Sequence, residues 1–127
     1  MLAQGTVEER QAGRDAANGR DSVARHLPMS EKQLQAAVVA MARHLGWRVY
    51  HTFDSRRSDA GFPDLVLVRG SRLVFAELKT AKGPVSDYQA RWLEALGATA
   101  AEVFLWRPAD WADGTVERVL RAPEAAA

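Results

Sequence analysis

From residue 29 onward, apolar residues recur at helical spacing and then at strand spacing. The first helix is bounded by clear end signals. Ser30 is a good N-cap residue, Gln33 three positions later completes a capping box, and Gly46 favours a C-terminal stop. At about 100° per residue, one apolar stripe runs along this helix and is formed by Leu34, Val38, Met41, Ala42 and Leu45.

Strand spacing begins directly after this helix. Residues 47–53 alternate, with one face formed by Trp47, Val49, His51 and Phe53. Two further apolar runs flank Gly70 and Ser71. A two-residue loop that opens with glycine favours a type II′ hairpin, whose twist matches that of its strands.

The second helix repeats the pattern of the first. Ser86 and Gln89 form a capping box, and we expect the helix to end near Leu96, at Gly97. Its inward face comprises Gln89, Trp92, Leu93 and Leu96.

Residues 101–106 alternate as a fourth strand, which ends before Pro108 because proline cannot donate to a sheet. Beyond it the pattern weakens. A short turn or helix surrounds Asp110 and Trp111, and residues 115–120 form either a helix or a strand.

These elements predict an α/β fold, in which a mixed central sheet is flanked by helices in the order α-β-β-β-α-β. The chain has 127 residues, enough for one domain, which we place at 29–127. Residues 1–28 lack a sustained period, and their four arginines are balanced by four acidic residues. We expect this segment to be a disordered or weakly structured tail.

The amino-acid composition excludes several kinds of functional site. The absence of cysteine excludes disulfides, thiolate zinc sites and a cysteine nucleophile. A formal net charge of +1 is too balanced to indicate nucleic-acid binding by itself. No apolar run approaches the roughly 20 residues of a membrane span, so we expect no membrane partner and a cytoplasmic location.

The predicted hairpin has charged residues at strand positions where hydrophobic core residues would be expected. Counting outward from Gly70 and Ser71 places Asp64 directly opposite Glu77 on one face, with Cβ atoms about 5 Å apart. Lys79 projects from the same face as Glu77. Two facing carboxylates repel each other, and a divalent cation between them removes the conflict.

Other polar residues have two interpretations each. Glu31 falls within the apolar stripe of the first helix, with Gln35 at the edge, so Glu31 is a candidate third carboxylate. Alternatively it complements the helix dipole. His51 is either a hydrogen-bonded core residue or a ligand. Arg56 and Arg57 lie in a polar loop that either contacts a phosphate backbone or is simply solvated.

The residue types favour phosphodiester hydrolysis. Mg²⁺ and Mn²⁺ take oxygen ligands, often one or two carboxylates together with water and substrate phosphate oxygens. Such an ion polarises a phosphoryl oxygen and generates hydroxide near neutral pH. Lys79 would orient that water or stabilise the developing charge. The chain has no histidine cluster for zinc, no glycine-rich nucleotide loop and no convincing serine triad.

Two short motifs, Pro63-Asp64 and Glu77-Leu78-Lys79, resemble the signature of the PD-(D/E)XK nuclease superfamily. Wider motifs resemble its VRR-NUC branch, the virus-type replication-repair nucleases. These are Ser-Glu-x-x-Leu-Gln, Gly-Trp-x-Val-Tyr-His, Gly-Phe-Pro-Asp-Leu-Val-Leu-Val, Glu-Leu-Lys-Thr and Gly-x-Val-Ser-x-x-Gln. The resemblance covers about residues 29–120 and implies a restriction-endonuclease-like αβββαβ core.

The resemblance also implies the roles of the site residues. Asp64 and Glu77 match the metal ligands for Mg²⁺ or Mn²⁺, with the backbone carbonyl of Leu78 as an additional ligand, and Lys79 matches the catalytic lysine. Glu31 matches the acid that completes the site directly or through water. Gln89 matches the glutamine of the later helix, which supports the site, and Gln35 and His51 match positions usual in the branch. Separately, we expect a DNA-binding groove of a dimer to be lined by Arg56, Arg57, Lys79 and Lys82.

The implied activity is that of a structure-selective DNA endonuclease. Short stand-alone members of this branch, from phages and bacteria, resemble Holliday-junction resolvases and act as homodimers. We therefore expect a homodimer that cleaves branched DNA, such as a four-way junction, in a bacterial or phage-infected cell. The alternatives are a flap, nicking or restriction-like nuclease, and a non-cleaving DNA-binding subunit with the same fold.

Overall fold

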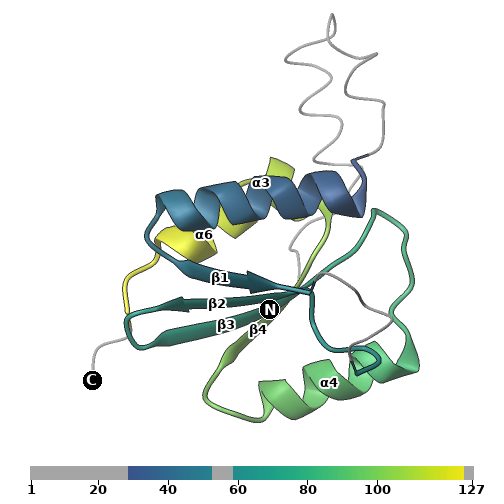
Figure 1. Cartoon of the computed structure of the whole chain (residues 1–127). Helices are drawn as coiled ribbons and strands as arrows, with labels where there is room; N and C mark the ends of the chain where they lie inside the picture. Colours follow the sequence, from purple (N-terminus) through teal and green to yellow (C-terminus); the bar gives the residue numbers. More distant parts are fainter. Residues whose placement is uncertain (1–28, 53–58, 125–127) are drawn as a thin grey trace, which may run out of the picture.

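The computed structural model describes residues 29–52 and 59–124, and Figure 1 shows their arrangement. The helices and strands follow the predicted αβββαβ order and are extended by two short helices. They are α3 (Glu31–His44), β1 (Arg48–His51), β2 (Leu65–Arg69), β3 (Arg72–Leu78), α4 (Asp87–Gly97), β4 (Glu102–Trp106), α5 (Pro108–Ala112) and α6 (Thr115–Arg121). This confirms the predicted α/β class with a mixed sheet flanked by helices.

The four strands form one sheet in the order β1-β2-β3-β4. The first three strands are antiparallel, whereas β4 lies parallel to β3 after a crossover through α4. The hairpin register is the predicted one, because Arg69 pairs with Arg72 and Leu65 pairs with Ala76. Gly70 has φ +58°, and no described non-glycine residue has positive φ, which is the pattern of a type II′ turn.

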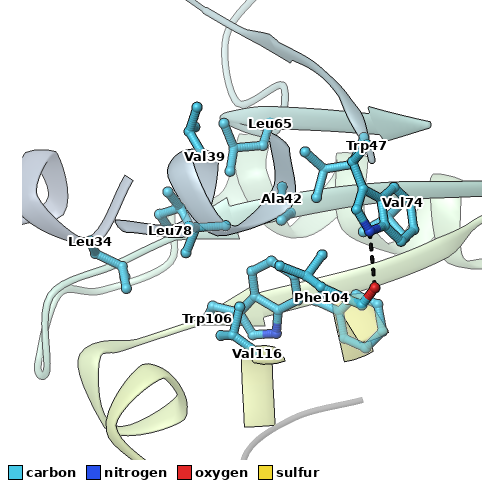
Figure 2. Close-up of a cluster of buried hydrophobic side chains, with 14 residues drawn as sticks. Leu34, Val39, Ala42, Trp47, Leu65, Val74, Leu78, Phe104, Trp106 and Val116 are labelled. Atoms are coloured by element: carbon cyan, nitrogen blue, oxygen red, sulfur yellow. Dashed lines mark hydrogen bonds between the residues drawn. The ribbon is translucent and has the colours of Figure 1, made fainter. Parts of the chain in front are cut away.

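One face of the sheet carries the hydrophobic core, shown in Figure 2. Helices α3 and α6 lie on that side in Figure 1, and α4 lies on the other. The core also includes Trp47, the residue before β1, whose Nε1 donates to the carbonyl of Leu120 in α6 at 3.0 Å. Its buried hydrophobic residues are Leu34, Val38, Val39, Ala42, Trp47, Leu65, Leu67, Val74, Ala76, Leu78, Phe104, Trp106, Val116 and Leu120.

The opposite face is covered less completely. The predicted inward residues of α4 are half-buried, and none of the residues of this helix is fully buried. Phe62 packs edge-on against Phe75 and Trp92, with ring centroids 5.9 and 4.9 Å away. Elsewhere on this face, large apolar side chains remain exposed on the strands: Tyr50, Val68 and Leu73.

Several local expectations are refined by the structure. Both capping boxes are present, at Ser30 and Ser86. The uncertain segment after Pro108 forms two helices, and α4 continues through Gly97 to a cap at Ala98. Strand β1 is shorter than the predicted 47–53, and Phe53 lies outside the described residues.

Glu31 is exposed at the first residue of α3, although its charge acts on the buried carboxyl group of Glu77. The position of a residue around a helix leads to burial of its side chain only where another element packs against that turn of the helix. No helix in the described ranges is long and apolar enough to cross a membrane.

Candidate active site

Asp64 and Glu77 meet at the end of the β2–β3 hairpin that lies away from its turn. Asp64 directly precedes β2, and Glu77 is the penultimate residue of β3. The strand register, continued by one pair beyond Leu65 and Ala76, places the two opposite each other, as the sequence predicted. Glu77 is 2% exposed, and Asp64 is half-buried.

Backbone hydrogen bonds hold Asp64 in place. Its Oδ2 accepts from the backbone N–H of Leu78 at 2.8 Å, and its own carbonyl accepts from the N–H of Thr52 at 3.3 Å. The side chain is therefore oriented by the neighbouring strand β3. The Leu78 N–H is occupied by this hydrogen bond to Asp64. The Leu78 carbonyl lies in the backbone between Glu77 and Lys79.

The two carboxyl groups perturb each other's ionisation. Burial, followed by the charge of Asp64, raises the pKa of Glu77 to about 8. Lys79 opposes this increase in the pKa, and Glu31 adds to it. Burial also raises the pKa of Asp64, against the opposing effects of the Leu78 N–H, Lys79 and a hydrogen bond with Glu77. Without a cation, the pair therefore holds a proton at neutral pH.

The surroundings of Glu77 leave one of its oxygens available. Oε2 accepts from Nε2 of Gln89 at 2.9 Å and lies 3.7 Å from Nζ of Lys79. Oε1 is buried and has no hydrogen-bond partner among the described residues. An unsatisfied, buried carboxylate oxygen is costly unless a proton or cation meets it. With Asp64 opposite, this donor set suits a hard divalent ion.

Gln89 joins helix α4 to this pair. Its Oε1 accepts from the Ser86 N–H at 2.9 Å, and its Nε2 donates to Glu77. One side-chain amide thus completes the capping box and fixes the orientation of a buried carboxylate. The sequence placed Gln89 on the inward face but did not identify this partner.

The connection that follows Lys79 is also fixed by the fold. The Lys79 N–H donates to the carbonyl of Trp106 at 3.0 Å. Nη1 of Arg107 donates to the carbonyls of Thr80 and Gly83 at 2.7 and 2.9 Å. The role of Arg107 is not predictable from the sequence, because nothing in the pattern of the chain distinguishes it from a solvated arginine after a strand.

Glu31 does not join the other two acids as a third direct ligand. Its charge contributes to the raised pKa of Glu77, so the two groups interact electrostatically. However, the described part of the chain contains no group of three histidine, cysteine or acidic side chains placed to hold a metal ion together. The structure therefore offers a pair of carboxylates, with a third acid acting at longer range.

The remaining predicted residues lie in different settings. Gln35 and His51 are half-buried, and His51 lies opposite Leu65 in the strand register, on the core side of the sheet. Lys82 is exposed in the connection before α4. The predicted DNA contacts Arg56 and Arg57 lie outside the described residues.

Comparison with known proteins adds two findings. The sequence model of the VRR-NUC domain family matches residues 9–108 of this chain. A solved structure described as a "VRR_NUC domain protein" is similar in fold, with a TM-score of 0.56 at 16% sequence identity. The similarity covers 72% of this chain and 86% of that one. No functionally curated protein shows significant sequence similarity.

Proposed function

The chain belongs to the VRR-NUC domain family, and from that premise we propose that it is a Mg²⁺- or Mn²⁺-dependent DNA endonuclease. VRR-NUC domains are nuclease domains of the PD-(D/E)XK superfamily, whose members generally use divalent metals. A nuclease domain in turn implies DNA as a substrate. The observation that carries the proposal is the buried Oε1 of Glu77, which has no hydrogen-bond partner within residues 29–52 and 59–124 and lies in a carboxyl group facing Asp64.

Asp64, Glu77 and the Leu78 carbonyl would hold the ion. When bound, it would polarise a phosphoryl oxygen and lower the pKa of an attacking water. Binding of the ion would also offset the repulsion between the Asp64 and Glu77 carboxylates, because a divalent charge favours the ionised form of both. Glu31 is exposed and would not contact the ion directly. It would complete the site through a water molecule.

Lys79 and Gln89 have separate tasks in this proposal. The Lys79 ammonium group, 3.7 Å from Glu77 Oε2, would place a positive charge where negative charge develops on the phosphoryl group. Its side chain is 12% exposed, so this charge is poorly screened by solvent. Gln89 would keep Oε2 occupied, so that Oε1 of Glu77 faces the ion.

The preferred substrate would be branched DNA, cut by a homodimer. A two-fold dimer presents two active sites, which suits the two strands cut in a four-way junction. The exposed apolar side chains of Tyr50, Val68 and Leu73 support association, because they occupy the incompletely covered face of the sheet.

A cleavage assay tests the activity directly. Labelled four-way junction, flap and linear duplex are incubated with Mg²⁺, Mn²⁺ or EDTA. We expect metal-dependent cleavage that is fastest on the junction. Replacement of Glu77 by Gln should slow cleavage about 100-fold or more, as loss of a key electrostatic group does in other enzymes.

Glu117→Gln provides the matched control. Glu117 is an exposed acid on α6, paired with Arg121 at 2.7 Å, and its replacement should leave the rate unchanged. Absence of metal-dependent cleavage on all three substrates would refute the nuclease proposal. Full activity of the Glu77→Gln variant would refute the site, and faster cutting of the flap would refute the junction preference.

A further inference from the structure

The first turn of α4 presents an aromatic ring to solvent beside the candidate active site. Tyr88 is 60% exposed, although the next residue, Gln89, reaches the buried Glu77 carboxylate. The backbone of Tyr88 is closely packed. A Cβ added to Gly61, which has φ +84°, would lie 2.4 Å from the Tyr88 carbonyl carbon. The backbone position is therefore fixed while the ring remains accessible.

A single exposed tyrosine is ordinary on a protein surface. One neighbour makes Tyr88 different. The Arg91 guanidinium lies over its ring, 5.9 Å from the centroid. Lys82 and Val85 are also exposed in the connection that precedes α4. An exposed aromatic ring combined with a cation is the arrangement that binds unpaired nucleotides by stacking.

Charge alone does not explain this surface. Asp87 and Glu94 are exposed acids on the same helix and offset the positive charges of Lys82 and Arg91. Long-range attraction of phosphates is therefore weak here, and contact with the face of a base is the stronger source of affinity.

We propose that the Tyr88 ring, with Arg91 beside it, stacks on an unpaired nucleobase next to the scissile phosphodiester. This inference rests on the proposed nuclease function and adds a feature of its substrate, which is branched DNA with a nucleobase unpaired at the branch point in the complex. Tyr88 adjoins Gln89, whose side chain reaches Glu77, so the stacked base would lie at the end of α4 that borders the candidate active site.

Binding is measured separately from cleavage. The Glu77→Gln protein is titrated into a branched DNA that carries 2-aminopurine at an unpaired position beside the branch. The same titration is repeated with the unsubstituted protein in EDTA. Stacking on an aromatic ring should quench the fluorescence of 2-aminopurine. Quenching should persist in Tyr88→Phe and disappear in Tyr88→Ala.

Glu94→Ala is the matched control, because Glu94 is an exposed residue of the same helix that carries no aromatic ring. This variant should retain the quenching. Tyr88→Ala should bind the branched DNA about tenfold more weakly. An abasic residue at the unpaired position should weaken binding by the unsubstituted protein to the same extent, and it should not weaken Tyr88→Ala further.

The outcomes distinguish the two proposals. Absence of quenching, quenching that survives Tyr88→Ala, or equal losses in Glu94→Ala would each overturn the stacking inference, whether or not the protein cleaves DNA. Quenching that requires Tyr88 in a protein without metal-dependent cleavage would retain the stacking site and refute the nuclease activity.

Discussion

At the residue scale, Glu77 is a buried acid whose surroundings favour its protonated form in the absence of a cation. Its pKa is raised from 4.5 to about 8, first by burial and then by the charge of Asp64. The folded protein therefore binds a proton that the unfolded chain has released at intermediate pH. The pKa of Asp64 is shifted in the same direction.

This shift predicts the pH dependence of stability. In EDTA, the stabilising contribution of the protonated Glu77 is fully present below about pH 4.5 and lost as the pH rises through about 8. The melting temperature should therefore be lower at about pH 8.5 than at about pH 6. Mg²⁺ should raise it, and more so at the higher pH, because a metal ion binds the deprotonated ligands.

Thermal unfolding of the Glu77→Gln and Glu117→Gln proteins checks the cause. The amide side chain introduced by Glu77→Gln cannot titrate, so this substitution should flatten the dependence of the melting temperature between these two pH values. Glu117→Gln should preserve it. A melting temperature of the metal-free protein that rises with pH over this interval would contradict the assignment.

At the element scale, two arginines beside the turn of the hairpin form hydrogen bonds to the C-terminal end of α6. Arg69 donates to the carbonyls of Leu120 and Ala122, and Arg72 donates to those of Val119 and Ala122. Both guanidinium groups also lie over the Trp47 ring, 4.7 and 4.9 Å from its centroid. Cations near a helix C-terminus complement its dipole, which offsets the repulsion between these two paired residues.

Removing one of these arginines should be costly. Arg72 is 8% exposed and makes two 2.7 Å hydrogen bonds to Glu102. Arg72→Met removes the side-chain donor to the Val119 carbonyl and to the partly exposed Glu102 carboxylate, while the Ala122 carbonyl keeps Arg69. We expect a loss of about 2–3 kcal/mol of unfolding free energy, measured by urea denaturation.

Arg121→Met supplies the comparison. Arg121 is 57% exposed and forms an i,i+4 pair with Glu117, so its loss should cost about 0.3–0.5 kcal/mol. Equal costs for the two substitutions would show that the hairpin is not held by Arg72.

At the scale of the whole molecule, the uneven coverage of the sheet predicts self-association. The α3 and α6 side holds the core, whereas Tyr50, Val68 and Leu73 stay exposed on the opposite side. A second copy would bury these side chains, and the hydrophobic effect would favour association by about 25 cal/mol per Å² of apolar surface removed from water.

A mass measurement in solution tests this expectation. The protein should have twice the mass of one chain, and Val68→Lys should shift it to the monomer by placing a charge on the exposed face. Val85→Lys is the matched control, because Val85 has similar exposure, 37% against 40%, but lies outside the sheet. A monomeric unsubstituted protein would contradict the proposed dimer.

The sequence by itself determined the features that depend on neighbours along the chain. Cap residues, helical spacing and a two-residue turn set the ends of α3 and α4 and the register of the hairpin. The opposition of Asp64 and Glu77 follows from that turn, because each step outward along a hairpin fixes the next pair. The carboxylate pair was therefore predictable from local geometry.

Only the tertiary structure decided which groups from separate elements meet. It gave Gln89 its bond to Glu77, left Glu31 exposed, and placed the two hairpin arginines on the end of α6. Periodicity gives the direction of a side chain around its own helix or strand, but not where the neighbouring element ends. Burial, and with it the raised pKa of Glu77, depends on that packing, because desolvation is set by all the elements around the group.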